Sequence, residues 1–388
     1  MRFVLGNRLM VEVGGTEVHL VTLADHLRRL GHEAVIYSPE LGPYADHARR
    51  RGLEVTSQLS ELPADCDVLL SQDALVAYDL AERYPRALHV FRICGHVFDF
   101  QLPPQQEGVV DLVVVLGDRY ARLAEGGGAK APVIRLRIPV DVDLRVPVGG
   151  IRNGPRRAVM LGNYGYRFDW VRSAWGEHGI EVERVGAANG SRPRYDVASA
   201  LAGVDIVVAK GRAAVDAMAC GRAVYVYDVF GGDGWVTPDT YPALEADHFA
   251  GLATDRVIGP AELARDLAEY DPGMGITNRD LVVQHHNARD HVLELLSVLG
   301  VHSPAAARPS SLDELGRLAK LQWSWEHLAR ELRIEEGALH QRLAEAEAEA
   351  ADGRSEALAL EQELEELKGT RAWRAATRYW RLRERLGW

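Results

Sequence analysis

Residues 205–234, DIVVAKGRAAVDAMACGRAVYVYDVFGGDG, form the stretch that most constrains what this chain can fold into. A short apolar run at residues 206–209 predicts a buried parallel strand, and residues 213–219 predict a helix after it. Residues 223–227 predict the next strand. A glycine pair follows that strand, Gly231 and Gly232. The stretch therefore predicts a strand–loop–helix–strand unit ending in a glycine loop, as found in α/β proteins.

The loop between the first predicted strand and the helix carries Lys210, Gly211 and Arg212. A helix N-terminus with free N–H groups beside cationic side chains suits a phosphate group. On this interpretation Lys210 contributes more than Arg212, because it lies nearer the end of the strand. An ordinary strand–helix–strand unit with solvated Lys210 and Arg212 explains the same residues, so the spacing leaves both interpretations open.

The first forty residues predict a second unit of the same kind. Residues 2–5 predict a strand, a loop ends in Gly14 and Gly15, and a helix with leucines at helical spacing follows. Residues 34–37 predict the next strand. The sequence GxGxxG is absent, so a dinucleotide site has little support. The two glycines either let the backbone approach a ligand or serve a tight turn.

These two units resemble the two ends of glycosyltransferases with two Rossmann-like domains, the GT-B fold, especially family 4. VDAMACGRAVYVYDVFGG is similar to the EAMAxGxPV…GG segment of the donor domain, and GGTEVHLVTLADHLRRLGHEAVIYS is similar to the GG-x-E…L…L…GHEV opening. The resemblance covers about residues 1–300. The chain departs from the family's Glu-x7-Glu motif, because Asp216 stands at the second glutamate and Val208 at the first.

The resemblance implies roles for particular residues. Asp216 would accept hydrogen bonds from the ribose of the donor, and His96 would position the acceptor or the sugar, so these two are the candidate catalytic residues. His96 follows the predicted strand at residues 88–93, where open α/β sheets place ligand-contacting groups. The implied donor-binding residues are Gly14, Gly15, Arg167, Lys210, Gly211, Arg212, Asp216, Gly231 and Gly232. An ordinary surface side chain is the alternative for both His96 and Arg167. No metal ion or other cofactor is expected, because cations and helix ends can neutralise a diphosphate.

Composition limits the class of protein. The formal net charge of -11 over 388 residues argues against a general nucleic-acid binder, which needs a positive field. The three cysteines include no CxxC pair, so they predict neither a disulfide framework nor a zinc cluster and favour a reducing, cytoplasmic compartment. No apolar run approaches the roughly 20 residues that span a bilayer, and the N-terminus does not resemble a signal peptide.

The predicted domains are an N-terminal Rossmann-like acceptor-side domain at residues 1–150 and a C-terminal Rossmann-like donor domain at residues 151–300. Residues 301–388 are predicted to form a linker, a coiled coil and a basic amphipathic helix. The triplet Asp141-Val142-Asp143 follows an apolar strand and a proline, which favours an interdomain linker over the metal-binding DxD motif of the other glycosyltransferase fold.

The C-terminal tail has a different pattern. Six leucines fit a seven-residue repeat: Leu332, Leu339, Leu343, Leu360, Leu364 and Leu367. The repeat predicts a coiled coil that joins subunits into a homo-oligomer, and a lone helix with an exposed seam is the alternative. Residues 371–388 then predict a basic helix with tryptophans on another face, which suits an anionic membrane surface or an acidic protein partner.

The sequence therefore predicts a cytoplasmic GT-B glycosyltransferase with peripheral attachment at the inner face of the membrane. It would move a sugar from a nucleotide-diphosphate-sugar donor to a glycan, lipid-linked or small-molecule acceptor. Retention of anomeric configuration is implied by the family alone. Two alternatives remain: a nucleotide-sugar epimerase of the same fold, and a non-catalytic glycosyltransferase-like assembly subunit. Val208, in place of a family carboxylate, favours the second.

Overall fold

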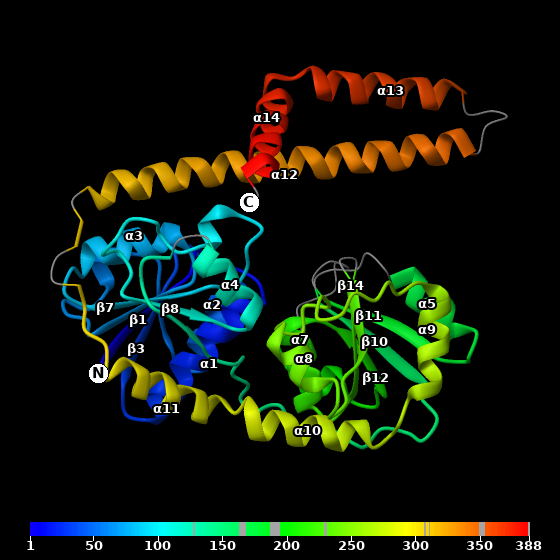
Figure 1. The fold of residues 1–388 in the computed structure, drawn as a ribbon, viewed down its shortest axis with the longest axis horizontal. Coiled ribbons are helices and arrows are strands. Elements are labelled where there is room, and N and C mark those ends of the chain that lie inside the picture. Colours follow the sequence, from blue (N-terminus) through cyan, green and yellow to red (C-terminus); the bar gives the residue numbers. More distant parts are fainter. Residues whose placement is uncertain are drawn as a thin grey trace. The chain divides into compact units, whose positions relative to one another are not determined.

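The structure is a computed structural model that describes residues 1–126, 129–162, 168–186, 195–228, 231–305, 308–309, 311–348 and 354–386. The chain forms two compact units. The first comprises Met1–His96 and Gln101–Leu312, and the second comprises Val97–Phe100 and Asp313–Trp388. The first unit contains two α/β sheets, and the second is helical (Figure 1).

The N-terminal sheet of the first unit has seven parallel strands in the order β5-β3-β1-β6-β7-β8-β9. Its strands are β1 (Arg2–Gly6), β3 (Glu33–Tyr37), β5 (Glu54–Thr56), β6 (Val68–Ser71), β7 (Leu88–Arg92), β8 (Leu112–Val115) and β9 (Val133–Arg135). Its helices are α1 (Gly15–Arg29), α2 (Pro43–Arg50), α3 (Ala74–Arg83) and α4 (Asp118–Gly126), and a small sheet joins β2 (Leu9–Met10) to β4 (Glu40–Leu41). The predicted opening, strand then glycine loop then helix then strand, is confirmed.

The second sheet has the order β11-β10-β12-β13-β14, with only β14 antiparallel to its neighbour among these strands. Its strands are β10 (Arg157–Leu161), β11 (Glu181–Val185), β12 (Ile206–Ala209), β13 (Ala223–Asp228) and β14 (Gly231–Trp235). Its helices are α5 (Phe168–Gly176), α6 (Val197–Ala200), α7 (Gly211–Ala219), α8 (Tyr241–Ala246) and α9 (Pro260–Asp266). The unit β12–α7–β13 confirms the predicted strand, helix and strand. Its apolar runs form strands that are buried on both faces of the sheet.

The glycine pair after β13 differs from the prediction. Gly231 and Gly232 begin the edge strand β14 and do not form an open loop. A Cβ atom at Gly232 would lie 2.6 Å from Tyr227 and 2.8 Å from Ile258. The space for a side chain is already filled, so packing is one physical reason for glycine at this position.

The last helix predicted for the donor domain packs on the N-terminal sheet instead. After α10 (Met274–His285) the chain enters α11 (Ala288–Leu299), whose Val292, Leu295 and Leu299 belong to the same buried cluster as residues of α1 and β1. An isolated bridge joins Val140 to Asn287 where the two crossing segments meet. The hydrophobic core beside the N-terminal sheet therefore contains residues from both α1 and α11.

The predicted linker is also anchored in the first unit. Arg308 forms an ion pair of 2.9 Å with Asp111, and the two side chains are only 3% and 4% exposed. The same guanidinium donates to the carbonyl oxygen of Gly108 at 2.7 Å, and the N–H of Ala305 donates to Asp111 at 2.8 Å. Arg308 and Ala305 are therefore held to the first unit by a buried charge pair and by hydrogen bonds.

The second unit contains three helices, α12 (Leu312–Ala348), α13 (Arg354–Gly369) and α14 (Arg371–Leu386). The predicted leucine seam is used inside one chain, because α12 and α13 lie side by side (Figure 1). Leu339 of α12 is buried with Leu360 and Leu364 of α13, and two further leucines pack against them. The seam therefore gives no support to the predicted contact between subunits. Among the described helices, none is both long enough and apolar enough to cross a membrane.

Candidate functional site

A buried arginine lies at the carboxyl end of strand β7. Arg92 is 4% exposed, and its guanidinium donates to Gln72 Oε1 at 2.7 Å and to Cys94 Sγ at 2.9 Å. Burial raises the pKa of Cys94 to about 11, so this thiol is neutral near pH 7. In the part of the chain that the structure describes, no carboxylate pairs with Arg92. A buried cation with neutral partners is costly unless an anion joins it.

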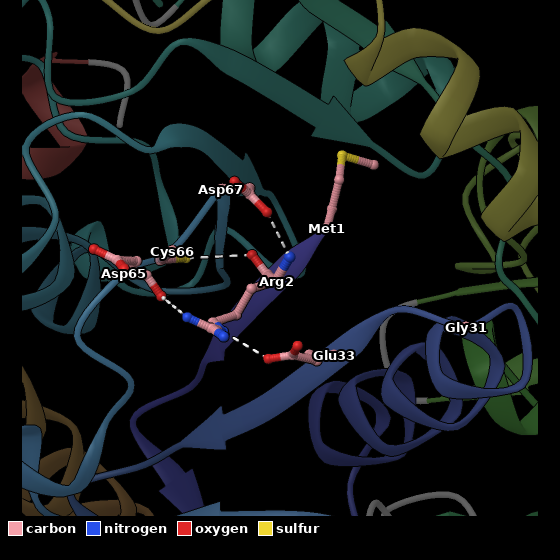
Figure 2. Close-up of a pocket in the computed structure, with 7 residues that line it drawn as sticks. All are labelled: Met1, Arg2, Gly31, Glu33, Asp65, Cys66 and Asp67. Atoms are coloured by element: carbon pink, nitrogen blue, oxygen red, sulfur yellow. Dashed lines mark hydrogen bonds and ion pairs between the residues drawn. The ribbon is translucent and has the colours of Figure 1, made fainter.

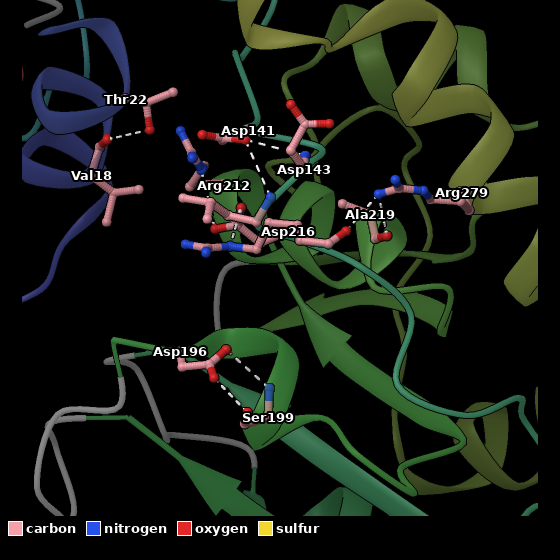
Figure 3. Close-up of polar contacts among 12 residues, drawn as sticks. Val18, Thr22, Asp141, Asp143, Asp196, Ser199, Arg212, Asp216, Ala219 and Arg279 are labelled. Atoms are coloured by element: carbon pink, nitrogen blue, oxygen red, sulfur yellow. Dashed lines mark hydrogen bonds and ion pairs between the residues drawn. The ribbon is translucent and has the colours of Figure 1, made fainter. Parts of the chain in front are cut away.

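A second arginine lies on helix α7, which follows strand β12 of the second sheet. Arg212, in the first turn of α7, donates through Nε to Asp216 Oδ2 at 3.1 Å, and Arg145 Nε lies 3.3 Å from Asp216 Oδ1. Figure 3 shows Asp216 and Arg212 side by side on α7. One carboxylate thus serves two arginines, and the buried Nη1 of Arg212 has no hydrogen-bond partner among the described residues. This cluster carries excess positive charge.

The two sheets meet at these arginines. A Cβ atom at Gly15 would lie 3.7 Å from Arg212 Cβ, so the first turn of α1 faces the first turn of α7. Gly14 is the N-cap residue of α1 and Lys210 that of α7, and neither provides a side-chain cap. Burial and the charge of Arg212 both lower the pKa of Arg92. Two helix N-termini and two arginines therefore favour a bound anion between the sheets.

A carboxyl group already occupies part of the α1 terminus. Glu17 accepts hydrogen bonds from Thr16 Oγ1 at 2.8 Å and from Asn7 Nδ2 at 3.2 Å, and a side chain at Gly14 would collide with it. Burial raises the pKa of Glu17. Because an acidic group there offsets the helix dipole, the arginines supply more of the positive charge than the amides of α1.

A strained turn places a histidine in the same region. His248 and Phe249 have φ angles of 62° and 53°, which non-glycine residues seldom adopt. A Cβ at Gly117 would lie 3.3 Å from His248 Cβ, and one at Gly211 would lie 3.7 Å from His248 Nε2. Burial, helped by the charge of Arg92, lowers the pKa of His248 to about 3. A neutral imidazole therefore lies between elements of the two sheets.

His96 reaches this region through a row of rings. Its Nε2 lies 3.2 Å from the guanidinium of Arg119, which leaves Nε2 the acceptor. The ring of Tyr120 lies edge-on to His96 with centroids 5.8 Å apart, and Tyr120 lies edge-on to His248 at 5.7 Å. The predicted acceptor-side histidine is therefore connected to the place where the two sheets meet.

Other predicted residues have different surroundings. Lys210 Nζ forms an ion pair with Asp228. Gly211 has a φ of 54°, and its N–H donates to the carbonyl oxygen of Phe249 at 2.8 Å. Val208 is fully buried within β12, so this strand position does not offer a side chain to a ligand. Arg167 lies outside the described residues.

Sequence reasoning missed Arg92, Arg145, Tyr120 and His248. A signal existed for Arg92, because an arginine within the otherwise apolar run LHVFRIC must find a polar partner or a ligand. Arg145 and His248 lie in irregular segments, where residue type and spacing carry little information about the neighbours. Their position depends on which loops the fold brings together.

The Asp141-Val142-Asp143 triplet forms a turn between the two sheets. Figure 3 shows Asp141 beside Asp143. Asp141 accepts hydrogen bonds from the N–H groups of Asp143 and Leu144, each at 3.2 Å, and it pairs with His26 at 3.3 Å and Arg29 at 3.4 Å. Burial alone would raise the pKa of Asp141, but these contacts outweigh it and lower the pKa to about 2. Within the described stretches no three His, Cys, Asp or Glu side chains gather as metal ligands.

A cavity of about 260 Å³ lies at the amino-terminal ends of strands in the N-terminal sheet (Figure 2). It is lined by residues at the amino ends of β1, β3 and β6, away from the strand end that carries Arg92. Its polar groups satisfy one another, since Arg2 Nε pairs with Glu33 at 2.6 Å and the N–H of Arg2 donates to Asp67 at 2.7 Å. Ligands of parallel sheets bind at the carboxyl ends of the strands, so the meeting place of the arginines is the better candidate.

Comparison with known proteins supports the fold that the sequence predicts. No protein-family model matches the chain, and no curated protein matches it significantly in sequence. The structure is similar to that of Anabaena Alr3699/HepE in complex with UDP and glucose, with 13% identity, 77% of this chain and 99% of that chain covered, and a TM-score of 0.50.

Two further structures are similar over the same share of this chain. An α-glucosyltransferase in complex with UDP and a 13-mer DNA is 11% identical, with 77% of this chain and 99% of that chain covered and a TM-score of 0.49. AviGT4, a glycosyltransferase involved in avilamycin A biosynthesis, is 17% identical, with 77% and 97% covered and a TM-score of 0.46. From the first of these three likenesses and its own two Rossmann-like sheets, the chain has the GT-B fold, extended by C-terminal helices.

Proposed function

We propose that this chain is a glycosyltransferase that transfers a hexose or related sugar from a uridine-diphosphate donor to a hydroxyl acceptor. The observation that carries the proposal is the pair Arg92 and Arg212, which lie at the end of β7 of the N-terminal sheet and after β12 of the second sheet and are incompletely neutralised by carboxylates. Arg92 is buried, and the side chain of Arg212 is 11% exposed. A diphosphate would supply the missing negative charge. HepE, which has the same fold, holds UDP and glucose.

The arrangement suits the chemistry of glycosyl transfer. The bond between the anomeric carbon and the diphosphate oxygen breaks, the acceptor oxygen bonds to that carbon, and the acceptor's proton passes to the departing diphosphate. Negative charge on the diphosphate rises during this step, and fixed guanidinium groups stabilise it. For the retained configuration that the family resemblance implies, acceptor and diphosphate would share one face of the sugar. In this proposal, cationic side chains neutralise the diphosphate.

The proposed roles of the two candidate catalytic residues fit this scheme. Each oxygen of Asp216 has a second lone pair, so it can accept a hydrogen bond from a ribose hydroxyl while it holds Arg145 or Arg212. His96 would contact the acceptor or the sugar from the side of β7. The acceptor classes remain those predicted: a glycan, a lipid-linked molecule or a small molecule.

Binding of UDP tests the proposal directly. Calorimetry should give saturable binding of UDP to the full chain, and Arg212→Met should raise the Kd by about 10- to 150-fold, equivalent to 1.5–3 kcal/mol for a charged hydrogen bond. Arg317→Met is the control, because Arg317 is 64% exposed and pairs with Glu314 in the neighbouring turn of the same helix. Equal affinity in the Arg212 variant and the parent would contradict the proposed site.

Turnover separates the proposal from its alternatives. With UDP-glucose and a panel of sugar and lipid acceptors, a glycosyltransferase releases UDP and forms a glycoside. An epimerase of the same fold would convert the sugar nucleotide without consuming an acceptor. A non-catalytic assembly subunit would bind UDP without turnover, and that result would favour the alternative suggested by Val208.

We also propose a peripheral contact of α14 with an anionic membrane surface or an acidic protein. Five arginines of this helix are exposed: Arg371, Arg374, Arg378, Arg381 and Arg385. Trp380 lies under the guanidinium groups of Arg333 and Arg383, each 5.3 Å from its ring. Its ring therefore packs within the helical unit, so the attraction would be mainly electrostatic. Such a contact would fit a cytoplasmic protein at the inner face of the membrane.

A further inference from the structure

The chain leaves the first unit directly after His96. Strand β7 ends at Arg92, and four residues later Val97–Phe100 belong to the second unit together with the C-terminal helices. Loops that follow the carboxyl ends of parallel strands build the ligand sites of open α/β sheets. The segment Val97–Phe100 is such a loop, and its partners are therefore relevant to the site.

Aromatic contacts fix this loop to α12. The rings of Phe98 and Phe100 are stacked with centroids 5.7 Å apart, and Trp323 of α12 meets them edge-on at 5.0 and 4.6 Å. The guanidinium of Arg330, seven residues further along the same helix, lies 5.1 Å from the Phe98 ring. Phe98 is only 9% exposed. Aromatic pairs of this geometry contribute beyond the area they bury.

A buried carboxylate adds a polar contact. Glu326 is 1% exposed, and its Oε2 accepts the backbone N–H of Asp99 at 3.1 Å. Its Oε1 accepts hydrogen bonds from Gln322 at 3.3 Å and from the hydroxyl group of Tyr379 in α14. One side chain of α12 therefore holds both the loop and the last helix.

We propose that Trp323 and Glu326 are positioning residues that hold residues 97–100 in one conformation and thereby set the place of His96. This inference rests on the proposed glycosyltransferase function. Ordering the backbone of a loop has an entropic cost, and the contacts with α12 offset that cost before a substrate binds.

Hydrogen exchange tests the positioning itself. In the full chain, Trp323→Ala should speed amide exchange in peptides covering residues 97–101 by at least tenfold. Trp325→Ala is the matched control, because Trp325 lies two residues away on the same helix and is 49% exposed. Unchanged exchange in the Trp323 variant, or an equal effect in the control, would overturn the proposal.

Kinetics with UDP-glucose test its consequence. Trp323→Ala should lower the rate of UDP release at least tenfold while the Kd for UDP changes less than twofold, and Trp323→Phe should restore most of the rate. Parallel loss of UDP affinity and rate, or no rescue by phenylalanine, would show general disruption of the fold and contradict positioning.

A second variant covers the case in which Trp323→Ala unfolds the helices. Phe98→Leu removes the aromatic ring on the loop side of the contact and leaves the sequence of α12 unchanged. It should give the same faster exchange with unchanged helical circular dichroism. If the parent chain releases no UDP from any sugar nucleotide, the proposed function fails, whereas the exchange experiment still decides whether Trp323 holds the loop.

Discussion

Asp216 holds two ion pairs and is also the residue proposed to bind the ribose of the donor. It lies between Arg145 and Arg212, with its side chain 7% exposed. Asp216→Asn should lower the free energy of unfolding by about 1–3 kcal/mol, because two largely enclosed guanidinium groups, on side chains 13% and 11% exposed, lose a charged acceptor. Urea denaturation at pH 7 measures this loss.

The matched control for that variant is Asp169→Asn. Asp169 pairs with Arg172 one turn away, but its side chain is 80% exposed, so the loss should stay below about 0.5 kcal/mol. The Asp216 variant should also bind UDP more weakly. Full stability together with full UDP affinity would remove Asp216 from the site.

Lys210 and Arg212, the two cations at the start of α7, should differ in their effect on UDP binding. The sequence favours Lys210 over Arg212, whereas the structure gives a reason for the reverse order. Lys210 is paired with Asp228, and Arg212 faces Gly15 at the start of α1. Arg212→Met should therefore weaken UDP binding more than Lys210→Met. An equal or larger effect of the lysine variant in calorimetry would restore the sequence-based order.

Among the elements, the segment between α11 and α12 is fixed by Arg308. Arg308→Met should destabilise the first unit by about 3–5 kcal/mol, because it leaves the buried carboxylate of Asp111 without its cation. Arg317→Met, on an exposed pair, should cost less than about 1 kcal/mol. Thermal or urea unfolding of both variants gives the comparison, and similar small losses would show that the segment is a loose linker.

Helix α14 provides a prediction about surface charge. The triple variant Arg374→Gln, Arg378→Gln and Arg381→Gln should reduce binding to phosphatidylserine vesicles by about 1 kcal/mol for each arginine. Sedimentation at low salt measures this binding, with Arg317→Gln as the control on α12. If the triple variant still pellets with the vesicles as the parent does, an acidic protein becomes the partner to seek.

At the scale of the whole first unit, Asp141 links stability to pH. It lies where the chain crosses between the sheets and contacts His26 and Arg29 of α1. Its pKa of about 2 is below the ordinary value near 3.9, so its contribution is complete above about pH 4 and disappears as the pH falls toward 2. Asp141→Asn should cost on the order of 2 kcal/mol at pH 7.

The measurement for Asp141 is urea unfolding at several pH values between 7 and 3. The difference between the variant and the parent should narrow as the pH falls below about 4. A difference that stays constant over this range would mean that the Asp141 charge does not stabilise the crossing, and that the turn depends on its backbone hydrogen bonds alone.

Both sheet units can be predicted from local patterns in the sequence. Apolar runs at β1 and β12, glycine-containing loops and the helical spacing in α1 and α7 are local patterns, so the period of side chains along the chain is enough to predict them. The same patterns placed His96 after a strand and Lys210 and Arg212 before a helix. Strand ends and helix starts are positions where chemistry can be expected without knowledge of the neighbours.

Which of these positions meet depends on the packing of the folded chain. Three contacts join residues that are separated in the chain: Arg212 with Gly15, Arg92 with Gln72, and Phe98 with Trp323. The leucine repeat shows the same limit, because a seven-residue period gives a seam but not its partner, which here lies in the same chain. Periodicity is a local property, whereas pairing depends on how whole elements pack.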